Sequence, residues 1–378
     1  MLDTAMKDIR DMGFTVRDFD GYACDAEMGA GDEAIAVLGH LDVVPAGDGW
    51  QTPPFTPTRD GDRIYGRGTS DDKGPVIASL LAMKAIRDAG IPLKRKIRLI
   101  LGCDEESNWE DMAYYTAHAD MPRIGFSPDA SFPVINTEKG MLHFQLKAEA
   151  AKTGLQVKHW MTGERVNVIP GHAEMLLEGG EALAEQVRAY AKETGLPYTA
   201  EVTAEGVKVT AEGIPGHSAY PEGRRNAIGM MLCLLLRLGV EGPLKTIAEA
   251  VGMEHDGASL GCACADKVSG PLTCNMGIMR VENGQIFCTL DDRCPVEADQ
   301  EKLIAATRAH LPGLQVEVIE QKAPHHVPAE SELVSSLLAA YHEETGLPAE
   351  ACSTGGGTYA KVLEQGVAFG ASFPDDED

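Results

Sequence analysis

The chain has 378 residues, of which 44% are hydrophobic, 24% charged and 6% aromatic, a composition typical of a folded globular protein with two or three domains. Its 33 basic and 58 acidic residues give a formal net charge of -25, which repels nucleic-acid phosphates and anionic lipid headgroups. Nucleic acid and membrane surfaces are therefore excluded as expected partners.

The sequence shows neither a targeting segment nor a disulfide framework. The longest apolar stretches, such as residues 228–236, fall short of the roughly 20 residues that a membrane span needs. The N-terminal sequence MLDTAMKDIRDMGF lacks the basic region followed by an apolar run that marks a secretory signal. The nine cysteines are scattered, without a Cys-x-x-Cys pair, which indicates reduced thiols. We therefore expect a cytoplasmic protein.

Residues 34–137 predict an α/β unit. Short apolar runs such as AIAVLGHL and KIRLILGC alternate with the helical segment VIASLLAMKAI. Continuous apolar runs of this kind are typical of strands that are buried on both faces of a parallel sheet. Folds of this class carry their ligand sites at the carboxyl ends of the strands.

The pattern changes near residue 140 and changes back after residue 322. Alternating strands such as GVKVTAEG and two helices, at residues 181–193 and 225–238, predict an α+β insert. Beyond the insert, the α/β pattern of the first segment returns, with an amphipathic helix, the glycine cluster STGGGT and the apolar strand VAFGASF. We therefore expect one domain from residues 1–137 and 322–378, and an inserted domain from residues 138–321.

Acidic side chains and one histidine follow the apolar runs of the first segment. Taken singly, each has an ordinary structural explanation, such as a turn or helix-capping residue for Asp71 or a solvated loop acid for Glu106. Together they would form a like-charged pocket at one sheet edge, which is costly unless cations neutralise it. The sequence therefore predicts a metal site, with the candidate residues His40, Asp42, Asp71, Asp72, Asp104, Glu105, Glu106 and Asp129.

The residue types of this cluster indicate the metal and the chemistry. Imidazole nitrogen and carboxylate oxygen are ligands that suit Zn2+, with Mn2+ or Co2+ as alternatives. One aspartate shared between two ions roughly 3.5–4 Å apart would give a two-metal hydrolase centre. Of the adjacent Glu105 and Glu106, only one can easily point at the same ion, which leaves the other to transfer protons.

Four motifs, GHLDVVP, YGRGTSDDKGP, GCDEES and FSPDASFP, occur in this order. With them the chain resembles, from residue 39 onward, the aminoacylase and glutamate-carboxypeptidase family of di-zinc metallopeptidases, most closely its carnosinase-related dipeptidase V branch. The resemblance implies an α/β fold, with a phosphorylase/hydrolase-like zinc-exopeptidase catalytic domain and an inserted α+β lid domain. It also implies a monomeric dipeptidase that hydrolyses small unblocked dipeptides by means of a metal-bound hydroxide.

The same resemblance implies which residues hold the metal. His40, Asp71 and Asp129 would bind one Zn2+. Asp71 would be shared with a second Zn2+, which Glu106 would also bind. The bond between Asp71 and Asp72 would be a cis peptide bond.

Three further residues would act in catalysis according to the resemblance. Asp42 would orient the histidine ligand through its second ring nitrogen, and Glu105 would be the general base. His217, in GIPGHSAYPEGRRNA, would reach from the lid domain to stabilise the tetrahedral intermediate. On the sequence alone, a loop histidine beside glycine and proline is more simply explained as a turn residue.

Two residues of the insert would help to bind the substrate. Asn167, in RVNVIPG, would have a supporting polar role by the same resemblance. Arg293, in TLDDRCP, would pair with a substrate carboxylate, for which a guanidinium group is well suited. The alternative for Arg293 is a surface salt bridge with Asp291 or Asp292.

The glycine cluster precedes a helical stretch, where exposed backbone amides can bind an anion. The resemblance implies that Gly355, Gly356 and Gly357 receive the free carboxylate of a dipeptide. A phosphate-binding loop is the rival interpretation, but such a loop would end in Gly-Lys-Ser/Thr, and this cluster does not.

The chain departs from the family pattern at its C-terminal end. In the family, a histidine that binds the second metal follows a Phe-Pro turn, whereas here VAFGASFPDDED ends at Asp378. We therefore expect a C-terminally truncated chain of weak activity, unless one of the terminal acids 375–377 supplies an oxygen ligand. Two alternatives stay open: a deacylase of N-acyl amino acids or succinyl-diaminopimelate, and an inactive fragment that retains metal binding.

Overall fold

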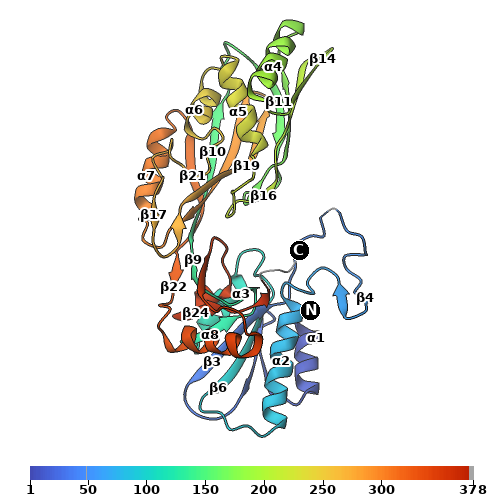
Figure 1. Ribbon diagram of the computed structural model, residues 1–378, viewed down its shortest axis with the longest axis vertical. Helices are drawn as coiled ribbons and strands as arrows, with labels where there is room; N and C mark the ends of the chain where they lie inside the picture. Colours follow the sequence, from blue (N-terminus) through green and yellow to red (C-terminus); the bar gives the residue numbers. More distant parts are fainter. Residues whose placement is uncertain (48, 374–378) are drawn as a thin grey trace. The chain divides into compact units, whose positions relative to one another are not determined.

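The computed structural model describes residues 1–47 and 49–373 (Figure 1). The chain divides into two compact units. The first unit consists of Met1–Glu138 and the segment that starts at His325, and the second unit consists of Lys139–Pro324. The terminal acids 375–377, considered above as substitute ligands, lie outside the described residues.

The first unit is built on a nine-stranded mixed sheet. Its strands are β1 (Val16–Phe19), β2 (Ala23–Met28), β3 (Ala34–His40), β6 (Lys96–Gly102), β7 (Ile124–Ser127), β9 (Val134–Glu138), β22 (His325–His326), β23 (Ala351–Thr354) and β24 (Gln365–Ala368). The strand order is β1-β2-β6-β3-β7-β24-β9-β22, and β23 also pairs with β9. Because β6, β3, β7 and β24 run parallel, their carboxyl ends lie at the same edge of the sheet.

Helices cover both faces of this sheet. They are α1 (Leu2–Asp11), α2 (Lys73–Asp88), α3 (Glu110–His118), α8 (Glu332–Thr345) and the 3-10 helix η1 (Tyr359–Val362). In β6, Leu99 and Leu101 belong to the core formed with α1 and α2, whereas Ile100 belongs to the core formed with α3 and η1. This alternation follows from the two-residue period of a strand, and it explains why the run KIRLILG is apolar almost throughout.

The second unit is an antiparallel sheet of eight strands. The strands are β10 (Gly140–Glu149), β11 (Val157–Thr162), β13 (His172–Leu177), β14 (Tyr198–Thr203), β15 (Gly206–Glu212), β19 (Thr273–Glu282), β20 (Gln285–Cys294) and β21 (Gln315–Lys322). Its helices are α4 (Glu181–Thr194), α5 (Ala227–Arg237), α6 (Pro243–Ala250) and α7 (Gln300–His310). The two helices predicted in the insert are found as α4 and α5, while α6 and α7 were not predicted.

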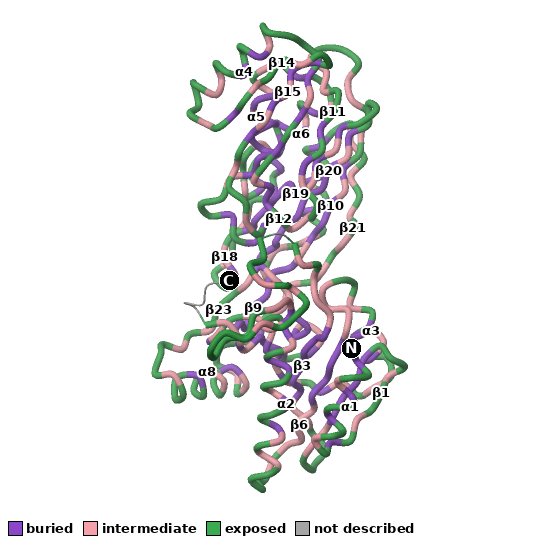
Figure 2. The backbone as a smooth tube through the Cα atoms, turned by 90° about the vertical axis from the view of Figure 1, so that its right-hand side faces the viewer, coloured by how far each residue is buried: buried purple, intermediate pink, exposed green. Residues whose placement is uncertain are grey.

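Helix α5 forms the centre of the core of the second unit. Most of its sequence, AIGMMLCLLLR, is buried, in keeping with the purple tube over this part of the chain in Figure 2. Asn226 caps the helix by accepting hydrogen bonds from the backbone amides of Ile228 and Gly229. Its side-chain amide donates to Asn275 and to the carbonyl of Met276 in β19, so the same residue fixes the helix to the sheet.

Short strand pairs complete both units. They are β4 (Thr58–Asp60) with β5 (Arg63–Tyr65), β8 (Ala130–Ser131) with β25 (Ala371–Ser372), β12 (Val168–Ile169) with β16 (Gly216–His217), and β17 (Ala265–Asp266) with β18 (Gly270–Pro271).

Three further predictions can be compared with the structure. The peptide bond between Asp71 and Asp72 is cis, as the family resemblance implies. All nine cysteines are free thiols. Within the described part of the chain, no helix is both long enough and apolar enough to cross a bilayer.

The carboxyl group of Asp292 is deeply buried in the second unit. Asp292, in β20, is fully buried, and neither of its oxygens has a hydrogen-bond partner among the described residues. Burial raises the pKa of Asp292 to about 7, from an ordinary value of 3.8. Between these two values the native state binds more protons than the unfolded chain, so the free energy of unfolding falls as the pH rises through this window.

We expect Asp292→Asn to remove this pH dependence. At about pH 4, where the carboxyl is protonated, the variant and the wild type should have similar stabilities. At about pH 8 the variant should be more stable by up to about 4 kcal/mol, because it has no charge to bury. Denaturant-induced unfolding at both pH values measures the difference. A difference that is the same at both would contradict the raised pKa.

Candidate metal centre and active site

His40 is the last residue of β3, and its imidazole lies among three carboxylates. Its Nε2 is 2.9 Å from Oδ1 of Asp71 and 3.6 Å from Oδ2 of Asp129. Its Nδ1 is 3.2 Å from Oδ1 of Asp42. The His40 side chain is only 1% exposed, so these contacts form in a protected position at the carboxyl edge of the sheet.

The three carboxylates determine the charge of this ring. Burial disfavours the imidazolium, but hydrogen bonds to Asp129, Asp42 and Asp71 more than offset this effect and raise the pKa of His40. In return, the hydrogen bond from His40 lowers the pKa of Asp71 below its usual range. Positive charge is thus strongly favoured where the ring meets these acids, which is the electrostatic requirement of a cation site.

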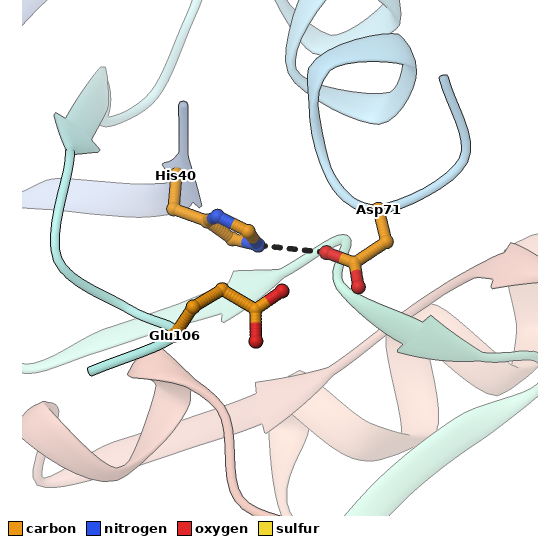
Figure 3. Close-up of side chains that lie close together, drawn as sticks. All are labelled: His40, Asp71 and Glu106. Atoms are coloured by element: carbon orange, nitrogen blue, oxygen red, sulfur yellow. Dashed lines mark hydrogen bonds and ion pairs between the residues drawn. The ribbon is translucent and has the colours of Figure 1, made fainter. Parts of the chain in front are cut away.

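The turn after β6 carries Glu105 and Glu106. Their backbone amides donate to Oδ1 and Oδ2 of Asp42, at 3.3 and 3.1 Å. Ligand atoms of His40, Asp71 and Glu106 all lie within 4.8 Å of one another, and Figure 3 shows the three side chains converging. Burial and the negative charge of Asp71 raise the pKa of Glu106. The structure therefore brings this glutamate to the predicted site.

A second group of ligand atoms overlaps with the first. It consists of His40, Glu105 and Asp129, whose ligand atoms also lie within 4.8 Å of one another. Glu105 therefore also lies within reach of candidate ligands. Distances alone do not separate a ligand from a general base, so the assignment of Glu106 as ligand and Glu105 as base stays a prediction.

The donor set fits a first-row divalent metal. In each of the two groups, one imidazole nitrogen and two carboxylate oxygens lie within 4.8 Å of one another, and Zn2+, Mn2+ and Co2+ accept such ligands. Asp72 adds a further buried acid at the site. Its Oδ2 accepts the backbone amide of His40 at 3.1 Å, while its Oδ1 has no hydrogen-bond partner in the described part of the chain. Burial raises the pKa of Asp72 to about 8.

The three residues predicted in the insert lie together in the second unit. β12, which follows Asn167, pairs with β16, which ends at His217. Ser218 donates its backbone amide to the carbonyl of Asn167 at 3.0 Å, and its hydroxyl to Asp291. Asp291 also accepts two hydrogen bonds, of 2.8 and 2.9 Å, from Arg293. A single buried carboxylate thus links the loop of His217 to Arg293.

The ion pair of Arg293 corrects one alternative derived from the sequence. Arg293 is 3% exposed and Asp291 is fully buried, so their pair is not a surface salt bridge. Burial would raise the pKa of Asp291, but the charges of Arg293 and His143 lower it to about 2. Desolvation and the positive charge of Arg293 lower the pKa of His217. The roles of these side chains toward a substrate stay predictions.

The glycine loop, residues 353–358, leads into the first turn of η1. There Thr358 donates its backbone amide and its hydroxyl to the carboxylate of Glu138, at 3.1 and 2.8 Å. Nζ of Lys361 lies 3.8 Å from the same carboxylate. At this helical turn the bound anion is therefore a side chain of the protein itself, which the sequence did not predict. The binding of a substrate carboxylate by the three central glycines stays a prediction.

Two buried residues near the acidic cluster were missed in the sequence. Tyr359, in η1, donates its hydroxyl to Asp111, in α3. Asp111 also accepts the backbone amides of Cys103 and Asp104. An acid in the first turn of a helix is common, because it interacts favourably with the helix dipole. The position of Asp111 in the sequence therefore does not indicate that it also binds Tyr359 and the backbone amides of Cys103 and Asp104.

The sequence is similar to those of known peptidases. Residues 36–376 match the peptidase family M20/M25/M40. One relative, "Putative dipeptidase YtjP" of Bacillus subtilis, is 36% identical over 374 residues, which is 96% of this chain and 80% of that protein. Another, "Putative dipeptidase SH1171" of Staphylococcus haemolyticus, is 34% identical over 383 residues, which is 97% of this chain and 81% of that protein.

Solved structures confirm the predicted fold. Human carnosine dipeptidase 1 has a TM-score of 0.55 and 14% identity, with 100% of this chain and 85% of that chain covered. The di-peptidase Dug1p of Saccharomyces cerevisiae has a TM-score of 0.58 and 15% identity, with 99% and 84% covered. The family match over most of the chain, and relatives more than 30% identical, show that this protein belongs to peptidase family M20/M25/M40.

Proposed function

We propose that the protein is a metal-dependent dipeptidase that hydrolyses unblocked dipeptides. The observation that carries the proposal is the convergence of one imidazole and several carboxylates at the carboxyl edge of the parallel strands. Family membership supports a metal-dependent peptidase. The names of the sequence relatives, and of carnosine dipeptidase 1 and Dug1p, support a dipeptide as the substrate.

Four residues are the proposed ligands. His40, Asp71 and Asp129 would hold one ion, because both carboxylates approach Nε2 of the ring. Asp71 and Glu106 would contribute to a second ion. Zn2+ is the proposed metal, with Mn2+ or Co2+ as alternatives. A bound divalent ion supplies Lewis acidity, which polarises the peptide carbonyl and makes water more acidic.

Glu105 is the proposed general base and acid. It would take a proton from the attacking water and deliver it to the amine that leaves when the peptide bond breaks. Asp42 would hold this residue in place. The same carboxylate contacts Nδ1 of His40 and accepts the backbone amides of Glu105 and Glu106, so it orients a ligand and the acidic turn together.

The second unit is the proposed lid, and His217 its proposed contact to the reacting carbonyl. The backbone amide of Ala219 donates to Nδ1 of His217 at 3.2 Å, so the neutral ring carries its proton on Nε2. The lowered pKa favours this neutral form. Nε2–H can then donate to the developing oxyanion. Asn167 and Arg293 are proposed to assist with substrate binding, because they lie in the same part of this unit.

The glycine loop is the proposed seat of the substrate carboxylate. Gly355, Gly356 and Gly357 expose little side-chain bulk, so backbone amides there can approach a carboxylate closely. Glu138 would fix the loop at its end, through its two hydrogen bonds to Thr358.

We further propose that the protein is cytoplasmic, since nine free thiols suit a reducing compartment. We also propose that it is a monomer, and light scattering would measure its mass.

A comparison of two substrate classes tests the proposed function. We expect Zn2+-loaded protein to cleave alanyl dipeptides, and to cleave N-acetylalanine at least about tenfold more slowly, because the acyl compound lacks the ammonium group of a dipeptide. A chelator should abolish both activities, and added Zn2+, Mn2+ or Co2+ should restore them. If only the acylated compound is cleaved, the protein is a deacylase. If neither is cleaved by metal-loaded protein, the proposed function is wrong.

A further inference from the structure

The acidic loop, residues 103–109, is anchored by a buried carboxylate outside the proposed ligand set. Asp111 is 2% exposed. Its Oδ2 accepts the backbone amides of Cys103 at 2.6 Å and Asp104 at 2.9 Å, and its Oδ1 accepts the amide of Met112 at 2.6 Å. The first two of these bonds fix the segment that leads directly into Glu105.

The same oxygen also receives a donor from the other end of the sequence. The hydroxyl of Tyr359 donates to Oδ2 of Asp111, although the two residues are 248 positions apart. Tyr359 is 1% exposed and directly follows the glycine loop. One carboxylate oxygen therefore joins the acidic loop to the turn that ends the glycine loop.

The hydrogen bond between Asp111 and Tyr359 is closely packed against Gly102 and Trp109. A Cβ atom on Gly102 would lie 2.2 Å from Oδ2 of Asp111 and 2.6 Å from the hydroxyl oxygen of Tyr359, so only glycine fits there. The ring of Tyr359 packs edge-on against Trp109, with ring centroids 5.4 Å apart. Trp109 in turn donates its indole N–H to the backbone carbonyl of Glu105 at 2.7 Å. A second line of contacts thus runs from Tyr359 to the acidic loop.

The turn that carries Tyr359 is also bound to a second buried carboxylate, that of Glu138. Glu138 accepts the backbone amide and the hydroxyl of Thr358, the residue before Tyr359. Burial and the hydrogen bond to Asp111 raise the pKa of Tyr359, so its phenol keeps the proton that it donates. The turn is thus fixed to Glu138 through Thr358 and to Asp111 through Tyr359.

We propose that Asp111 and Tyr359 are positioning residues that couple the glycine loop to the acidic loop. This inference rests on the proposed function, in which the glycine loop holds one end of the substrate and the acidic loop carries Glu105 and Glu106. The coupling sets the distance between the substrate's carboxylate and the group that transfers the proton. Neither residue needs to touch the substrate for this purpose.

Tyr359→Phe is the test variant, because it removes one hydroxyl and keeps the ring against Trp109. Tyr115→Phe is the matched control. Tyr115 is also fully buried in the first unit, and its hydroxyl donates to a different buried carboxylate, Oδ2 of Asp25 at 2.6 Å. Both variants should lose similar amounts of thermal stability. Asp111→Asn is less suitable, because it would disturb the four hydrogen bonds that Asp111 accepts instead of one.

Three measurements on the full chain separate the two variants. In Tyr359→Phe, amide hydrogen exchange of residues 103–107 should accelerate about tenfold, Zn2+ affinity measured against a chromophoric chelator should fall about tenfold, and kcat should fall by a similar factor. In Tyr115→Phe, all three should stay within about twofold of the wild type.

The outcomes distinguish the coupling from the function on which it rests. If the wild type binds Zn2+ and cleaves dipeptides, but Tyr359→Phe behaves like Tyr115→Phe in all three measurements, the coupling is wrong and the proposed function stands. If the wild type binds Zn2+ without cleaving dipeptides, the proposed function fails. In that case faster exchange of residues 103–107 and weaker Zn2+ binding in Tyr359→Phe alone would still support the coupling of the two loops.

Discussion

Replacing Glu105 by alanine should lower kcat for dipeptides at least about a hundredfold, while the metal content of the protein stays nearly unchanged. A general base transfers protons in the transition state but does not hold the ion, so its loss affects the chemical step and not metal binding. Steady-state kinetics at saturating Zn2+ measure the first effect. Elemental analysis after dialysis measures the second.

Glu106→Ala is the matched comparison for this experiment. Both glutamates have their backbone amides bound to Asp42, so the two substitutions should disturb the turn to a similar extent. Because Glu106 is a proposed ligand, the Glu106→Ala protein should retain less metal than the Glu105→Ala protein. If Glu105→Ala loses the metal and Glu106→Ala keeps it, the two roles are exchanged. The proximity of Glu105 to His40 and Asp129 would then explain the result.

Asp71→Asn should have the largest effect on metal binding. Asp71 has the shortest contact between a carboxylate and the His40 ring, 2.9 Å, and it is the proposed shared ligand of both ions. An amide has a similar shape but no negative charge, so the variant loses electrostatic attraction to both ions at once. We expect the affinity for Zn2+ to fall at least about a hundredfold, and activity at limiting Zn2+ to fall with it.

The control for this variant is Asp62→Asn. Asp62 is an exposed acid in the turn between β4 and β5, so its replacement changes the net charge by the same amount without touching the site. Competition with a chromophoric chelator measures Zn2+ affinity for both variants. Equal affinities for Asp71→Asn and Asp62→Asn would contradict the proposed ligand set, because they would show that only the overall charge matters.

The general plan of the fold could be predicted because it depends on local patterns. A buried parallel strand has to be apolar on both faces, and β3 and β6 show this pattern in the sequence. Parallel neighbours have their carboxyl ends at one edge, so residues that follow such strands are expected to meet. His40 ends β3 and Glu106 follows β6, and the structure brings them together.

What could not be predicted depends on contacts between segments far apart in the chain. The hydrogen bond between Asp111 and Tyr359 joins residues whose own neighbourhoods contain no shared pattern. Glu138 lies at the end of a buried strand, β9, but it binds Thr358 instead of contributing to either candidate metal group. The pattern of strands predicts where acidic residues lie. Which partner each acidic side chain binds depends on side-chain packing.

Asp42 shows the same limit within the site itself. The resemblance predicts its contact with His40, and the structure contains that contact. Its hydrogen bonds to the amides of Glu105 and Glu106 depend on the shape of a turn, which residue types do not specify. Arg293 is a comparable case, because its charged neighbours suggested an exposed pair and the sheet around it buries that pair.

The position of β3 between β6 and β7 has a consequence for how the protein acquires its metal. Hydrogen bonds on both sides make an interior strand one of the last elements to open in a native protein, and His40 is fixed at its end. The imidazole is therefore preorganised before any ion arrives. Metal uptake should then proceed without a folding step, in contrast to zinc fingers, in which the ion and the fold form together.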